Sequence, residues 1–250
     1  MTTELPGKAL ARELIEQSRE AARHTPIDPI IEAARERRLD DGAAFRLICR
    51  LWAMERLFYY IYGGWGQGLE LNDYPPSVKY LFARQIMDES THEMLYMDTM
   101  LGKGWLDKQR DAFDHPCGRF AINCSLSSYA YSLRYFASYP HSVRIAALNL
   151  GPKIVELAWM EQLADALDDA ALKGVFTSQF VENRSHINMG RRIVEEQVST
   201  PFDTELCRRV CAAARKDYAK FLTELANLVL QRETGADTGQ VRGLFQRVIE

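Results

Sequence analysis

Two short segments of the chain each place a glutamate and a histidine within one helical turn. The first is Asp-Glu-Ser-Thr-His at residues 88–92, and the second is Glu-Asn-Arg-Ser-His at residues 182–186. Residues three or four apart share one face of a helix. Carboxylate oxygens and imidazole nitrogens are donors that suit iron or manganese. The two segments therefore indicate a metal site held between two helices.

Two further glutamates extend this pattern. Glu55 lies 34 residues before Glu89, and Glu156 lies 26 residues before Glu182. The order of a carboxylate followed by a carboxylate with a histidine thus occurs twice. A four-helix bundle made of two such hairpins brings all six side chains to one point in its core. The predicted ligands are Glu55, Glu89, His92, Glu156, Glu182 and His186.

Glu55 lies on the apolar face of its predicted helix, among Ile48, Leu51, Trp52, Phe58, Tyr59 and Tyr62. An ionised carboxylate in such a place costs several kcal/mol unless it is paired or binds a cation. A metal ion meets this requirement. An ion pair with Arg50 or Arg56 at a helix edge is the alternative.

Glu89 and His92 share a face with Phe82 and Met100, so they also point inward. We expect Glu89 to bridge two ions. The neighbouring Asp88 is placed to accept a hydrogen bond from an imidazole on another helix, which would fix the nitrogen that binds metal.

Glu156 competes with Glu161 for the third carboxylate position. We favour Glu156 because it lies 30 residues before His186, close to the 37 residues between Glu55 and His92, as two comparable hairpins require.

The last segment departs from regular spacing, because Asn183 stands three residues before His186 and Glu182 stands four before it. A π-type widening of the helix would bring Glu182 into register with His186. Alternatively Asn183 binds weakly, or this position has lost a ligand and two metals are no longer held.

Apolar residues recur every three or four positions along most of the chain, which predicts an all-α fold. The expected helices are 7–23, 28–39, 42–62, 77–102, 117–138, 141–169, 170–197 and 203–232. No composition change divides the chain, so residues 1–250 form one expected domain. Its core bundle is 42–197, with 117–138 as a crossover and with flanking helices in 7–39 and 203–250.

The composition excludes several classes of protein. A hydrophobic content of 47% suits a globular core, and a net charge of −3 without basic runs favours neither nucleic acid nor a membrane as partner. The start of the chain lacks a signal-peptide pattern, so a cytoplasmic location is expected. Five cysteines without a C-x-x-C pair indicate reduced thiols.

The segment 88–92, with the run His-Ile-Asn-Met-Gly-Arg-Arg-Ile-Val-Glu at 186–195, resembles the ferritin-like di-iron carboxylate superfamily. The two segments look like the metal-binding helices of bacterial multicomponent monooxygenase hydroxylases and of ribonucleotide reductase small subunits with their oxidase relatives. The resemblance covers about residues 42–197. It implies a ferritin-like four-helix bundle with the six ligands named above, Glu182 being one place off the family pattern.

The resemblance implies an oxidoreductase, a di-iron monooxygenase or oxidase. It would use two iron ions, or manganese in one or both positions, to activate dioxygen against a small organic substrate. An electron-donor protein is a further implied partner, and monomer and homodimer both stay open. Cavity walls are expected at Phe58, Tyr59, Trp159 and Met189, unless these residues only pack the core.

Two alternatives stay open. A non-enzymatic ferritin-like protein, metal-binding or structural, would explain the irregular spacing at Glu182 and Asn183. A haem-oxygenase-like di-iron protein is also all-helical, although such proteins typically use three histidines and only two lie on the ligand helices here.

Overall fold

A computed structural model describes residues 6–66, 76–119, 126, 129–130, 133 and 139–231, with the side chains of 58–66 and 78 left out. Within these residues the secondary structure is helical and contains no strand, which confirms the all-α prediction. The helices are α1 (Pro6–Ala21), α2 (Asp28–Arg35), α3 (Asp41–Gly66), α5 (Pro76–Gly102), α6 (Gln109–Asp114), α8 (His141–Asn149), α9 (Pro152–Ala166), α10 (Ala170–Thr177), α11 (Phe180–Gln197) and α12 (Pro201–Val229).

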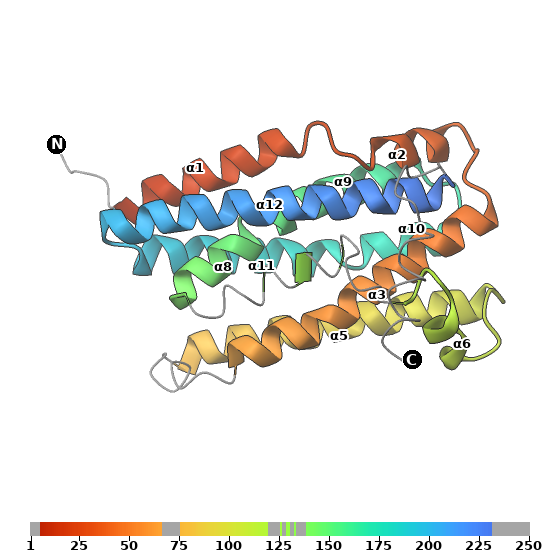
Figure 1. Cartoon of the computed structure of the whole chain (residues 1–250), viewed down its shortest axis with the longest axis horizontal. Helices are drawn as coiled ribbons and strands as arrows, with labels where there is room; N and C mark the ends of the chain where they lie inside the picture. Colours follow the sequence, from red (N-terminus) through yellow and green to blue (C-terminus); the bar gives the residue numbers. More distant parts are fainter. Residues whose placement is uncertain are drawn as a thin grey trace, which may run out of the picture.

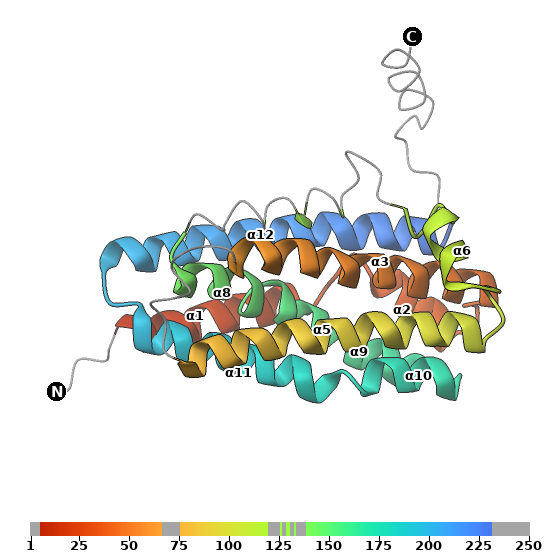
Figure 2. The same ribbon diagram turned by 90° about the horizontal axis from the view of Figure 1, so that it is seen from below.

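The long helices run roughly parallel to one axis of the molecule (Figure 1). Helices α3 and α5 form one closely packed pair, and α8 packs against both α11 and α12. Seen from below, α10 and α11 follow one another along nearly one line beside α5 (Figure 2). Helices α1 and α2 cover α9, and α1 also packs along α11. The core that positions the buried acids therefore lies between α3, α5, α9 and α11.

The prediction of one helix over 141–169 is wrong, because this segment forms two helices, α8 and α9. The break falls at Leu150 and Gly151, and α9 restarts with Pro152 at its first position. Proline has no backbone N–H and its ring clashes with the preceding turn of a helix, so it is tolerated only at a helix start. A Cβ on Gly151 would lie 2.7 Å from the carbonyl oxygen of Ala147, so this close turn requires glycine.

The helix predicted over 170–197 is also two helices, and the π-type widening expected near Glu182 is not found. The chain tightens at Ser178 and Gln179, where the Gln179 N–H donates to the Phe176 carbonyl three residues back. The buried Gln179 side chain donates to the Val175 carbonyl at 2.9 Å, which satisfies an acceptor at the end of α10. Glu182 consequently lies in the first turn of α11.

The other boundaries agree with the sequence within a few residues. Thr200 caps α12 by accepting a hydrogen bond from the Asp203 N–H at 3.0 Å, with Pro201 at the first helical position. Helix α6 was not predicted, and most of the predicted crossover 117–138 lies outside the described residues. Four cysteines are free and buried: Cys49, Cys117, Cys207 and Cys211. In the described part of the chain, no helix combines the length and apolar character needed to cross a membrane.

Candidate metal centre

The predicted ligands converge between four helices. Helix α3 contributes Glu55, α5 contributes Glu89 and His92, α9 contributes Glu156, and α11 contributes the last two residues, Glu182 and His186. Ligand atoms of Glu55, Glu89 and His92 all lie within 4.8 Å of one another, and these three side chains are buried. Three donors this close together could hold one metal ion after small side-chain movements.

Glu55 has both carboxylate oxygens buried without a hydrogen-bond partner. Neither arginine offered as an alternative partner serves it, because Arg50 pairs with Glu224 and Arg56 lies 3.8 Å from Glu93. Burial, and then the nearby charge of Glu89, raise the pKa of Glu55 well above its usual range. The carboxyl group must therefore carry a proton or face a cation.

His92 lies between two carboxylates on different helices. Its Nδ1 is 3.2 Å from Glu89 Oε2, and its Nε2 is 3.4 Å from Glu182 Oε2. Burial alone would raise the pKa of Glu89, but the charge of Lys153 and the hydrogen bond with His92 hold it well below its usual range. Glu89 is thus an ionised, fully buried carboxylate.

His186 makes the contact predicted for the acid next to Glu89. Its Nε2 lies 3.0 Å from Asp88 Oδ2, which confirms that Asp88 pairs with an imidazole on a neighbouring helix. Burial lowers the pKa of His186, which favours a neutral ring whose Nε2–H donates to Asp88. Its Nδ1 then carries the lone pair and faces Glu89 Oε1 at 3.7 Å. His186 is therefore oriented as a metal ligand would be.

Lys153 is the site residue that sequence reasoning missed. Its side chain is fully buried, and its Nζ lies 3.0 Å from Glu89 Oε1 and 3.1 Å from Oε2. It also donates to Glu156 Oε1 at 3.2 Å. Burial alone would lower the pKa of Lys153, but Glu156, Glu89 and Glu55 together raise it, so the side chain is an ammonium. Its position three residues before Glu156, on the same apolar face, was the available signal.

The structure separates the competing acids. Glu161 points away from the cluster and pairs with Arg184 at 2.5 Å, whereas Glu156 lies inside it beside Lys153. Glu182 and Asn183 both come near the centre in different ways. Asn183 is fully buried with its Oδ1 unpartnered, while the Glu182 side chain is 31% exposed beside His92.

Buried aromatic side chains surround the acids. Tyr96 donates to Gln179 Oε1 at 3.4 Å, and Trp159 Nε1–H donates to the Tyr218 hydroxyl at 3.0 Å. Burial, and then the glutamates of the centre, raise the pKa of Tyr96 and of Tyr129 well above the usual range. Trp159 is thus engaged in core packing, as is the buried Met189. The side chains of Phe58 and Tyr59 lie outside the described residues.

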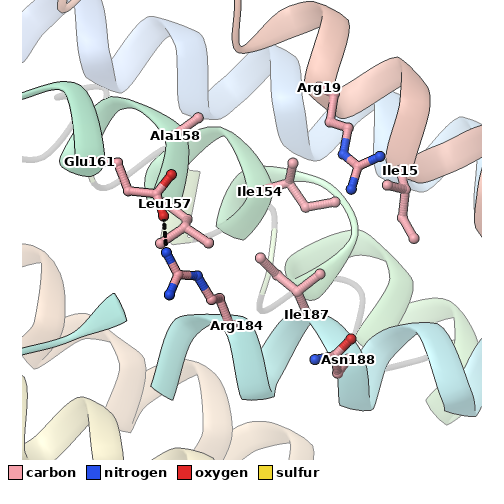
Figure 3. Close-up of a pocket in the computed structure, with 9 residues that line it drawn as sticks. All are labelled: Ile15, Arg19, Ile154, Leu157, Ala158, Glu161, Arg184, Ile187 and Asn188. Atoms are coloured by element: carbon pink, nitrogen blue, oxygen red, sulfur yellow. Dashed lines mark hydrogen bonds and ion pairs between the residues drawn. The ribbon is translucent and has the colours of Figure 1, made fainter. Parts of the chain in front are cut away.

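A surface pocket of about 400 Å³ lies on the other face of α9 and α11 (Figure 3). Its walls are Ile15, Arg19, Ile154, Leu157, Ala158, Glu161, Arg184, Ile187 and Asn188. None of the predicted ligands lines it, and Glu161 and Arg184 pair across it. The pocket is therefore separate from the buried acids, and the candidate chemistry belongs to the enclosed cluster.

Comparison with known proteins adds no family to this description. No protein-family model matches the sequence, and a search of curated proteins finds no significant match.

Proposed function

We propose that this protein is a non-haem iron enzyme that activates dioxygen to hydroxylate or oxidise a small organic substrate. The observation that carries the proposal is the group of Glu55, Glu89 and His92, three buried donors close enough to bind one ion. Glu55 supports it most directly, because its buried oxygens have no hydrogen-bond partner. A cation at this point would remove that deficit.

The arrangement of helices supports the same proposal. Helices α3 and α9 each offer one glutamate, while α5 and α11 each offer a glutamate with a histidine. Ferritin-like dimetal proteins distribute their ligands in this way. We therefore propose a ferritin-like bundle of α3, α5, α9 and α11, with α10 continuing the line of α11.

The donor set fits iron, and manganese in its place, because it consists of carboxylate oxygens and imidazole nitrogens without thiolate. Iron bound here would pass electrons from the donor protein to dioxygen. The chain would bind the ion, orient its ligands and enclose the site. Glu55, Glu89 and His92 would hold the ion, Asp88 would orient His186, and the enclosed setting would exclude water from the reaction. Dioxygen, a small organic substrate and an electron-donor protein are the proposed partners.

The residues present fit the two halves of a di-iron centre unequally. The half next to Glu55 has unpartnered carboxylate oxygens, as a metal position requires. The half between Glu89 and Glu156 already contains the Lys153 ammonium. The proposed enzyme rests on the first half.

The test is oxygen-dependent oxidation of ferrous iron. Metal-free protein would be loaded with one equivalent of Fe²⁺ under nitrogen and then exposed to air while near-ultraviolet absorption is recorded. We expect rapid oxidation in the wild type. Glu55→Gln should abolish it, because the amide has nearly the shape of a protonated carboxyl but cannot supply a charged ligand.

Glu161→Gln is the matched control, since Glu161 is a glutamate that pairs with Arg184 outside the cluster. It should oxidise iron as the wild type does. Iron oxidation at the same rate in Glu55→Gln and in wild type would contradict the proposal.

A second candidate is a non-enzymatic metal-binding or structural subunit. Asn183 favours it, because a neutral amide is buried where the regular pattern has a carboxylate. In that case the protein would bind metal, and Fe²⁺ bound to it would oxidise in air no faster than free Fe²⁺.

A further inference from the structure

Lys153 is fixed in the centre by the start of α9. Gly151 and Pro152 break the chain between α8 and α9, so Lys153 is the second residue of the new helix. Its side chain is enclosed, with 0% exposure. A lysine is almost never fully buried unless it is paired, and here it contacts Glu89 and Glu156. The ammonium thus joins α9 to α5 through charge.

The ammonium lies between two of the carboxylates that a second metal ion would need in the expected dimetal pattern. A second ion would bind between Glu156, His186 Nδ1 and the oxygen of Glu89 that faces α11. That oxygen is Oε1, which lies 3.7 Å from His186 Nδ1 and 3.0 Å from Lys153 Nζ. Lys153 Nζ also lies 3.2 Å from Glu156 Oε1. Two of the three ligands of a second ion are therefore already bound to the lysine.

The formal charges favour one metal ion rather than two. Glu55, Glu89 and Glu156 are enclosed, each at most 2% exposed, and together carry three negative charges when ionised. Lys153 supplies one positive charge and one divalent ion supplies two, so the enclosed charges balance. A second divalent ion would leave two unbalanced positive charges, or one if the partly exposed Glu182 is included. Excess charge in a low-dielectric interior is costly.

The remaining buried acid does not alter this balance. Asp88 pairs with His186 and lies 3.8 Å from Arg84, on the outer side of the imidazole. Its charge is therefore compensated outside the group of Glu55, Glu89 and Glu156.

We propose that the Lys153 ammonium takes the place of the second metal ion, so that the centre holds a single divalent transition-metal ion at Glu55, Glu89 and His92. This inference rests on the metal site of the proposed function and limits that site to one ion, where the family resemblance implied two. Lys153 is then a positioning residue, because it holds Glu89 and Glu156 in place.

The test is the number and magnetic coupling of bound Mn²⁺ ions. The whole chain, freed of metal by chelation, would be equilibrated with excess Mn²⁺, desalted and analysed for metal content and by electron paramagnetic resonance. We expect one Mn²⁺ per chain with the six-line signal of an isolated ion. Lys153→Met, which keeps the length of the side chain and removes its charge, should bind two ions with an exchange-coupled signal.

Lys103→Met is the matched control, because Lys103 pairs with Asp169 away from the cluster. It should bind one ion, as the wild type does. Two coupled ions in the wild type would overturn the inference while leaving the proposed enzyme intact, and one ion in Lys153→Met would overturn it as well. If no ion binds the wild type, the proposed function fails with it. Even if Lys153→Met does not fold, two coupled ions in the wild type would still overturn the inference.

Discussion

The buried acids and the packing around α8 occupy neighbouring parts of one molecule, yet they are stabilised in opposite ways. In the acid cluster, enclosed charges are held by other charges, chiefly the Lys153 ammonium against Glu89 and Glu156. Around α8, whose nine residues are all buried, helices approach so closely that size decides the fit. A Cβ on Gly190 of α11 would lie only 2.7 Å from the Cβ of Asn149.

The difference indicates which substitutions each region can accept. A charged centre tolerates changes of shape better than changes of charge, because an uncompensated buried ion costs several kcal/mol. A close helix contact is limited instead by the size of the side chains that meet in it. Asn149 at the end of α8 links the two regions, since its amide donates to the His186 carbonyl at 2.9 Å. Changes of charge in one region and of size in the other therefore test the comparison.

The largest expected effect is a difference in stability between variants of two glutamates, Glu55 and Glu89, that are equally buried. In metal-free protein, Glu89→Gln should lower the free energy of unfolding by roughly 3 to 5 kcal/mol, because Lys153 loses an ionised partner inside the core. Glu55→Gln should change it by less than about 1 kcal/mol, because the raised pKa of Glu55 keeps that group protonated and the amide resembles it. Chemical denaturation in the presence of a chelator measures both values. Equal losses in the two variants would show that Lys153 does not hold the centre.

Metal binding should stabilise the wild type by about 2.7 kcal/mol when free Mn²⁺ is 100 times the dissociation constant. For a chain of this size that corresponds to a rise in Tm of roughly 5 to 10 °C. Thermal unfolding with and without Mn²⁺ measures the shift. Glu55→Gln should lose it and Glu161→Gln should keep it. The same Tm with and without Mn²⁺ in the wild type would count against any metal centre.

A change of size should act on the other region. Gly190→Ala should destabilise the protein by about 1 to 3 kcal/mol, because the new methyl group meets Asn149 across the contact between α8 and α11. Gly174→Ala is the control, since a Cβ at that position in α10 meets no atom within 4 Å. It should stabilise the helix by about 0.5 to 1 kcal/mol. Urea denaturation of the two variants measures the contrast, and a neutral Gly190→Ala would show that the helices can separate at little cost.

The last expected effect is a pH dependence at the start of α8. Burial, and then the neighbouring Arg144, lower the pKa of His141 to about 4, below its ordinary value of about 6.5. Between these values the unfolded chain binds the proton and the folded chain does not, so stability falls as the pH falls. By pH 5 the loss should reach about 2 kcal/mol.

Denaturation curves between pH 7 and pH 4.5 measure this slope. His141→Leu should make it shallower, whereas replacement of His24, whose side chain is 96% exposed, should leave it unchanged. An unchanged slope in His141→Leu would show that other groups cause the acid sensitivity.

The helical class and the convergence of the six predicted ligands could be predicted from the sequence, because apolar periodicity and carboxylate spacing are local signals. Of the two helix breaks, only the one at Gly151 could be foreseen. Gly151 and Pro152 are a readable stop, but the tightening at Gln179 depends on a side chain that bonds back to Val175 within the fold. The role of Lys153 was equally hidden, since a lysine on an apolar face becomes an ion-pair partner only when α5 supplies Glu89.

The ammonium of Lys153 also fixes an order of assembly. Small zinc domains are unfolded without their metal, because nothing else neutralises and joins their ligands. Here the chain brings its own cation, which already joins α5 to α9 when no metal is bound. In the proposed enzyme the chain would therefore complete its fold first and acquire metal afterwards. Scarcity of metal would then yield folded protein without metal, and not chains lost to degradation.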